Sequence, residues 1–250
     1  QTTGGVSLVK TSLITGVDYT MSVTSINAFG AGGVTTSASF VIPTAVTNLS
    51  LANQQITTVE LAWTPAYGAT GYTIATSPAT TAQTTTNPNY TFTGLSGGTL
   101  YTFIVTSTNS VGSGDSATSS PILTRPAAVT DITPSNYTLT TVDAVWVGAT
   151  GAASYIITTT PATTTQTTTG TTLTKTGLTA GTSYIINIQS VNSSGNGGTA
   201  SSVSFFTLPL AVTNLTPSNP QITTADLTWT AAVGATSYKM TTTPVSTTQT

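Results

Sequence analysis

The sequence repeats itself every 83 residues, and this period limits what the chain can fold into. The interval separates Trp63 from Trp146 and Trp146 from Trp229. Tyrosines and prolines keep the same register, as the list Tyr72, Tyr155, Tyr238, Pro43, Pro126 and Pro209 shows. A fixed period of this length indicates an array of similar domains, each with its own core, rather than one large domain.

Within each repeat, apolar and polar residues alternate over short segments. In residues 59–63, Val59, Leu61 and Trp63 are expected to face inward, and segments 101–107 and 184–190 have the same period of two. Such segments, separated by Gly, Pro and Asn, are typical of half-buried strands. No segment has a helical apolar stripe, so the sequence predicts an all-β fold.

The order of these marks resembles the fibronectin type III family. A Trp on the second strand is followed nine residues later by a Tyr, then by a Leu-Gly-Tyr corner, then by a strand that ends in Asn and Gly. The resemblance implies tandem β-sandwiches in which the corner phenol bonds to nearby backbone, but it implies no particular function. The expected core residues are Trp63, Trp146, Trp229, Tyr72, Tyr155, Tyr238, Tyr19, Tyr101 and Tyr184.

The repeat predicts two full domains, at 45–127 and 128–210, flanked by two half domains. Residues 1–44 supply the later strands of one sandwich, and residues 211–250 supply the early strands of another. Either the chain is an excerpt of a longer array, or the halves of neighbouring copies complete each other. Both interpretations predict head-to-tail contact between copies, and hence a filament. We favour the excerpt, because split domains are rare and repeat arrays are common.

The shortage of charge excludes several function classes. The chain has four Lys and Arg, six Asp and Glu, and neither Cys nor His. We therefore expect no enzyme, cofactor, metal site or nucleic-acid partner. No apolar run is long enough to span a membrane as a helix, so we expect no membrane insertion in this segment.

The acidic residues are too scattered for paired-carboxylate chemistry. Glu60, Asp143 and Asp226 occur once per repeat at one strand position, where we expect outward, solvated charges. A calcium ion at a domain junction, held by Asp131, is an alternative with few carboxylates to support it. Lys10 and Lys175 stand where Phe92 should face inward, and we expect their ammonium groups to reach the sandwich end.

Two kinds of glycan acceptor are present. Asn-X-Ser/Thr sequons occur at Asn48, Asn89, Asn136, Asn192 and Asn214. Threonine clusters follow the third strand of each repeat, at 76–86, 158–172 and 241–250, and resemble O-glycosylated stalks. A threonine-rich edge strand would look the same, and a flat ice-binding array is a third interpretation. The candidate O-glycan acceptors are Thr84, Thr85, Thr86, Thr163, Thr164, Thr165, Thr167, Thr168 and Thr169.

These observations favour a structural function. The first hypothesis is a glycosylated filament or fibre outside a cell, on a cell surface or on a virion surface, in which copies of the chain contact head to tail. The alternative is an adhesin, a virion fibre, or spacer repeats of a secreted polysaccharide-acting protein.

Overall fold

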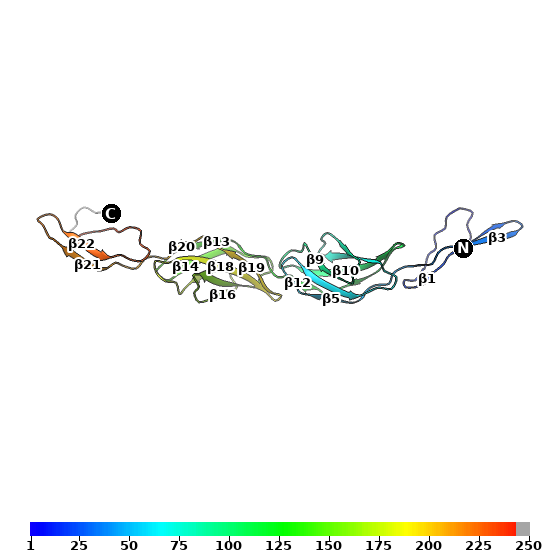
Figure 1. Ribbon diagram of the computed structural model, residues 1–250, viewed down its shortest axis with the longest axis horizontal. Coiled ribbons are helices and arrows are strands. Elements are labelled where there is room, and N and C mark those ends of the chain that lie inside the picture. Colours follow the sequence, from blue (N-terminus) through cyan, green and yellow to red (C-terminus); the bar gives the residue numbers. More distant parts are fainter. Residues whose placement is uncertain (244–250) are drawn as a thin grey trace. The chain divides into compact units, whose positions relative to one another are not determined.

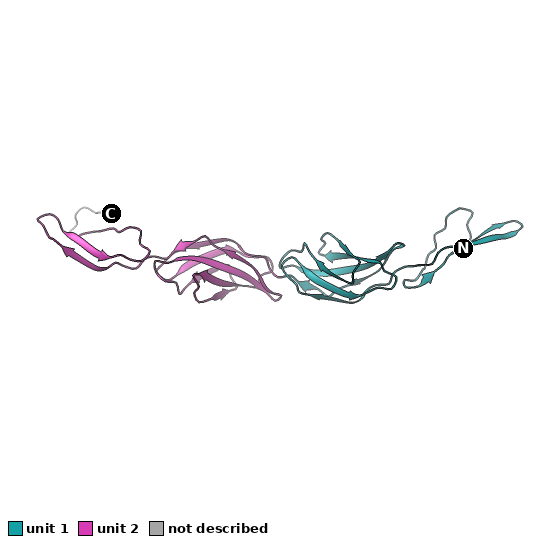
Figure 2. Ribbon diagram, viewed as in Figure 1, with its two compact units in different colours: residues 1–124 teal, residues 125–250 magenta. Residues whose placement is uncertain are grey.

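The computed structural model describes residues 1–243, which form strands, turns and loops without a helix (Figure 1). Two compact units divide the chain, residues 1–124 and residues 125–250, and each contains one complete sandwich (Figure 2). The prediction of an all-β chain with tandem sandwiches is confirmed.

The sandwich of the first unit has two antiparallel sheets. Its strands are β5 (Thr47–Ala52), β6 (Val59–Thr64), β7 (Gly71–Ser77), β8 (Gln83–Thr85), β9 (Asn89–Phe92), β10 (Leu100–Asn109), β11 (Gly112–Thr118) and β12 (Ile122–Leu123). One sheet has the order β5-β6-β9. The other has the order β11-β10-β7-β8, and β12 pairs with the start of β10.

The second unit repeats this arrangement strand for strand. Its strands are β13 (Thr130–Ser135), β14 (Val142–Val147), β15 (Ser154–Thr160), β16 (Gln166–Thr168), β17 (Thr172–Lys175), β18 (Ser183–Asn192), β19 (Gly195–Ser201) and β20 (Phe205–Phe206). The sheets have the orders β13-β14-β17 and β16-β15-β18-β19, and β20 pairs with β18.

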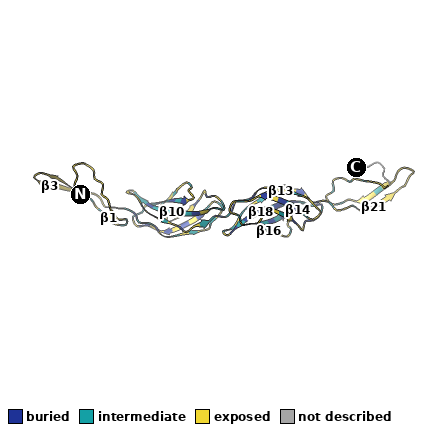
Figure 3. Ribbon diagram, turned by 180° about the vertical axis from the view of Figure 1, so that it is seen from behind, coloured by how far each residue is buried: buried dark blue, intermediate teal, exposed yellow. Residues whose placement is uncertain are grey.

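Each core lies between the two sheets and is built from alternate strand residues (Figure 3). Along β6, Val59, Leu61 and Trp63 are buried while the residues between them are exposed. The Trp63 ring meets Tyr72 edge to face, with centroids 5.1 Å apart. Trp146 and Tyr155 form the same pair at 5.4 Å, so both sandwiches are organised around one aromatic contact between their sheets.

The two cores differ at one position. Phe92 is fully buried and meets Phe103 edge to face, whereas Lys175 occupies the equivalent place at the end of β17. The Lys175 side chain is also fully buried, and its ammonium donates hydrogen bonds to the carbonyls of Thr164 (2.8 Å) and Thr176 (2.9 Å). The ammonium therefore reaches backbone oxygens at the sandwich end instead of water.

A tyrosine pins the crossover in each sandwich. The Ser96 N–H donates to the Tyr101 hydroxyl (3.1 Å), and the Thr179 N–H donates to the Tyr184 hydroxyl (3.1 Å). Each phenol ring is buried, so one side chain joins the core to the turn beside it. This is the contact that the family resemblance implies.

The flanking segments hold less structure. Their strands are β1 (Asp18–Tyr19), β2 (Ser22–Asn27), β3 (Gly30–Thr36), β4 (Phe40–Val41), β21 (Thr213–Ser218) and β22 (Asp226–Thr230). The hairpin β2-β3 is exposed at every residue. Tyr19 keeps its corner bond from the Ile14 N–H (2.9 Å) and is half-buried. Trp229 is 37% exposed although it still contacts Tyr238.

Candidate functional site

The carboxylates lie singly on the surface, each bonded to a neutral partner. Glu60 accepts from the Asn53 side-chain amide (2.6 Å), Asp143 from Asn136 (2.9 Å), and Asp226 from Asn219 (2.9 Å). These contacts recur because each Asn stands seven residues before its acid, across the hairpin of the first two strands of its repeat. Within residues 1–243, no three acidic groups come together as a metal site would require.

Hydrogen bonds shift the pKa of one carboxyl and of one phenol bonded to a carboxylate. The hydroxyl of Thr174 donates to Asp143 (2.6 Å) and, with the Asn136 amide, lowers the pKa of that carboxyl. The Tyr67 hydroxyl donates to Asp18 (2.7 Å), and this bond, together with the negative charge of Asp18, raises the pKa of the phenol. These contacts fix local conformation and resemble no acid–base pair.

A junction in the first unit joins residues 1–44 to the first sandwich. The Asn109 amide, at the end of β10, donates to the carbonyls of Val41 and Gly68, both at 2.9 Å. The Ser107 hydroxyl donates to the Thr44 carbonyl (2.6 Å). Two side chains of β10, Ser107 and Asn109, therefore hold the incoming backbone of residues 41–44, and Asn109 also binds the loop at Gly68.

Small residues allow close approach at the same junction. Gly68 has a φ of 76°, and a Cβ there would lie 2.6 Å from a Val41 methyl group. In the second unit, the equivalent Gly234 packs against Gly181, where a Cβ on either residue would overlap the backbone of the other segment. Both junctions therefore need glycine, because side chains would push the segments apart.

Three of the five sequons have their amide nitrogens in use. Asn48 donates to the Thr64 hydroxyl (3.0 Å), Asn214 to Thr230 (2.9 Å), and Asn136 to Asp143 (2.9 Å). All three residues have positive φ, which Asn tolerates better than most residues. Each of these amides therefore ties the first strand of its repeat, or the turn that follows it, to a side chain of the second strand.

The other two sequons differ from each other. Asn192, at the end of β18, is only 8% exposed, and its Oδ1 accepts from the Ser194 N–H (2.9 Å). It stands at the repeat position of Asn109, which binds junction backbone. Asn89, in contrast, is exposed on β9, and its side chain makes no hydrogen bond within the described part of the chain.

The threonine clusters lie at the edge of each larger sheet. Thr84 and Thr85 belong to β8, and Thr167 and Thr168 belong to β16; each strand pairs on one side only. Thr84 and Thr167 are exposed while Thr85 and Thr168 are half-buried. The remaining acceptors flank these strands: Thr86, Thr164, Thr165 and Thr169 are exposed, and Thr163 is half-buried and bonded to Thr159. Residues 244–250 of the third cluster lie outside the described residues.

Sequence reasoning missed the junction residues. Asn109, Gly68 and Gly234 carry the contacts between segments; Asn109 served only as a mark of the family resemblance, and the two glycines belong to no motif named above. The available signal was the repeat itself, since Gly68, Gly151 and Gly234 keep the 83-residue spacing and Asn109 and Asn192 do so too. No helix among residues 1–243 could span a membrane.

Comparison with known proteins identifies related chains. The family model of the fibronectin type III domain matches residues 44–125. The receptor-type tyrosine-protein phosphatase eta of Gallus gallus is 32% identical over 235 residues, which cover 88% of this chain and 16% of that protein. This chain thus spans about a sixth of the length of that curated relative.

Solved structures with similarity include a segment of two fibronectin type III domains from chicken tenascin. It has 18% identity and a TM-score of 0.39, with 65% of this chain and 99% of that chain covered. The FN1-FN3 domains of chicken CNTN1 have 19% identity and a TM-score of 0.33, with 74% of this chain and 76% of that chain covered.

Proposed function

We propose that this chain is a structural segment of an extracellular or surface fibre. The premise is that residues 44–125 are a fibronectin type III domain, whose strand order recurs in the second unit. Type III domains generally serve as non-catalytic structural or binding modules. In this function the repeats act mechanically: each buries its own core, and copies of the chain contact head to tail. The copies carry covalent glycans.

The junction in the first unit is the observation that carries this proposal. Asn109 binds Val41 and Gly68 at once, so it links the end of one repeat to a loop of the next. A spacer that only tethers domains needs no such bonds, and flexible linkers rich in Gly and Ser would serve it. Here the connecting segment is held by side chains of the following sandwich, which suits a fibre that transmits force.

The low charge supports the same function. Four basic and six acidic residues in 250 leave little repulsion between copies that pack closely. Solubility then depends on hydroxyl and amide groups, and glycans on the threonine clusters or on Asn would add to it.

Immunogold electron microscopy tests the proposal directly. Antibody raised against the whole chain should label the fibre or appendage of the source along its length. Label confined to a tip, to a smooth membrane surface or to a free enzyme would overturn the fibre and support the adhesin or spacer alternative. The name of the avian relative, a receptor-type protein, favours a cell-surface version of that alternative.

The mechanical part of the proposal predicts a defined effect of Asn109→Ala. Loss of the two bonds from its amide nitrogen to Val41 and Gly68 should weaken the junction by about 1–3 kcal/mol, because each bond contributes about 0.5–1.5 kcal/mol. The change also removes the Oδ1 that accepts from the Val111 and Gly112 N–H groups in the turn after β10. Hydrogen exchange in residues 40–45 should then accelerate roughly tenfold or more.

Asn27→Ala is the matched control for this change. Asn27 ends β2 as Asn109 ends β10, but its side chain accepts only from the Phe29 N–H (2.8 Å). If both variants left exchange at residues 40–45 unchanged, the junction would not be held by Asn109.

A further inference from the structure

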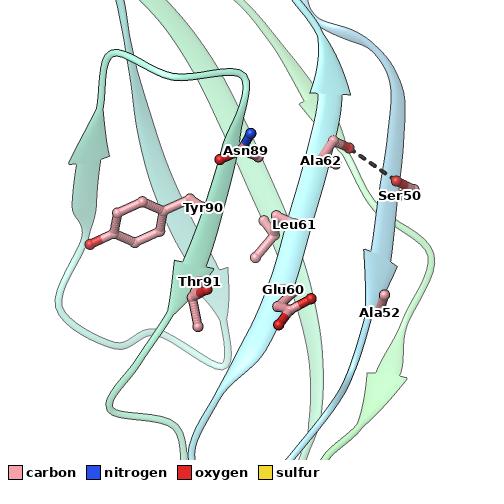
Figure 4. Close-up of a pocket in the computed structure, with 8 residues that line it drawn as sticks. All are labelled: Ser50, Ala52, Glu60, Leu61, Ala62, Asn89, Tyr90 and Thr91. Carbon is pink, nitrogen blue, oxygen red and sulfur yellow. Dashed lines mark hydrogen bonds between the residues drawn. The ribbon is translucent and has the colours of Figure 1, made fainter.

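A shallow hollow of about 260 Å³ lies on the outer face of the sheet β5-β6-β9 (Figure 4). The small side chains of Ala52 and Ala62 form the floor of this hollow, and Glu60 lines one side of it. Asn89 and Thr91 come from the neighbouring strand β9, and Asn89 lies directly opposite Ala62 in the register. A sequon side chain thus borders a surface depression.

Asn89 is also the one sequon whose amide is both exposed and unbonded within residues 1–243. Asn48, Asn136 and Asn214 use their amide nitrogens in hydrogen bonds, and Asn192 is buried. Because side chains alternate along a strand, Asn89 and the Thr91 hydroxyl project from the same outer face. Both chemical groups of this sequon are therefore presented together.

The second sandwich shows what the same place looks like without a sequon. Thr172 replaces Asn89, and Val145, opposite it in the register, replaces Ala62 and fills the floor. The Thr174 hydroxyl binds Asp143 (2.6 Å) and closes the side. Glu60 and Asp143 both accept from an asparagine amide, but the Thr91 hydroxyl makes no bond to Glu60, and the hollow beside Thr91 stays open. At this place the first sandwich thus has a sequon beside the small Ala62, and the second has Thr172 beside the larger Val145.

We propose that Asn89 carries an N-linked glycan whose first sugar lies over this hollow. The donor class is an oligosaccharide linked to a polyisoprenyl diphosphate. The Asn89 Nδ2 forms a bond to C1 of the first sugar, the bond from C1 to the phosphate oxygen breaks, the lipid diphosphate leaves, and the amide loses one proton to a base of the transferase. The apolar face of the sugar covers Ala52 and Ala62, and its hydroxyls face the Glu60 carboxylate.

This inference rests on the proposed function in one respect, namely that the chain passes through a secretory compartment. Its test removes that dependence. The full chain is secreted from a eukaryotic cell line behind an added leader, and glycans are released by peptide N-glycosidase in heavy-oxygen water, which marks each former acceptor. We expect the mark at Asn89 in most molecules and none at Asn192. Absence of the mark at Asn89 overturns the proposal, while labelled fibres in the source would leave the proposed function intact.

The place of the sugar is tested by hydrogen exchange before and after glycan release. Release of the glycan should reduce the protection of backbone amides in β6 and β9 from exchange. Ala62→Val places the side chain of Val145 at the floor of the hollow and should abolish most of this loss. The fraction of molecules glycosylated at Asn89 should stay the same in this variant. Thr172→Asn is the matched control, because it creates a sequon with Thr174 opposite the larger Val145 instead of an alanine. Its glycan should leave protection of β14 unchanged on release. Equal losses in all three proteins would show that the hollow holds no sugar.

Discussion

Trp146→Ala should unfold the second sandwich selectively. Trp146 is 3% exposed, and its ring contacts Tyr155 edge to face. Its indole N–H is buried without a partner in the described structure, so the substitution breaks no hydrogen bond. The whole loss comes from apolar contact and the cavity left behind, which for Trp→Ala costs about 3–5 kcal/mol.

The loss can be measured by hydrogen exchange at increasing urea concentration. For a small domain whose unfolding free energy falls by about 2 kcal/mol per molar urea, a loss of about 4 kcal/mol lowers the midpoint by roughly 2 M. Peptides from β14 and β15 should show this shift, while peptides from β10 should keep their wild-type midpoint and serve as an internal reference.

Trp229→Ala supplies the matched control. Trp229 has the same position in its repeat and the same tyrosine contact, but it is 37% exposed. Its removal should cost less than about 1 kcal/mol, near the range of surface substitutions. The assignment of Trp146 as the centre of a core would be refuted if the two variants lost equal stability.

Two further changes probe single contacts. Burial lowers the pKa of Lys175 below its ordinary value of 10.5, so the folded state binds this proton less tightly than the unfolded state. The free energy of unfolding should therefore rise with pH, from the pKa of the folded state towards 10.5. Urea titrations at neutral and alkaline pH should show this rise in the wild type and not in Lys175→Met. Parallel pH profiles for the two proteins would contradict the reasoning. Tyr184→Phe removes the acceptor of the Thr179 N–H and should cost about 0.5–1.5 kcal/mol by thermal unfolding, an effect absent if the corner is not stabilising.

Much of the fold could be predicted because strand burial follows from side-chain alternation. Val59, Leu61 and Trp63 are spaced by two residues and therefore share one face of β6, and their apolar character favours the register that buries this face. The repeat then carries this assignment from one sandwich to the next. Lys175 shows the limit: the pattern predicts an inward side chain, but only the path of the loop through Thr164 shows that the ammonium finds a carbonyl instead of water.

The sequons show a second limit of prediction from sequence. The motif is defined by three consecutive residues, whereas the accessibility of its asparagine depends on segments far away in the chain. Asn192 and Asn89 satisfy the same three-residue pattern, yet one is buried at a strand end and the other is exposed on an outer sheet face. The difference depends on which segments pack over each residue. The repeat offered a partial signal, because Asn192 shares its position with Asn109, whose amide binds backbone.

The pairing of three of the six carboxylates with asparagine amides has an environmental consequence. Glu60, Asp143 and Asp226 each hold a hairpin through a neutral donor, and no ion pair forms among residues 1–243. Dissolved salt weakens attraction between opposite charges far more than it weakens a bond to an amide. A surface built this way keeps the same internal contacts in fresh water, in brine and through abrupt changes between them.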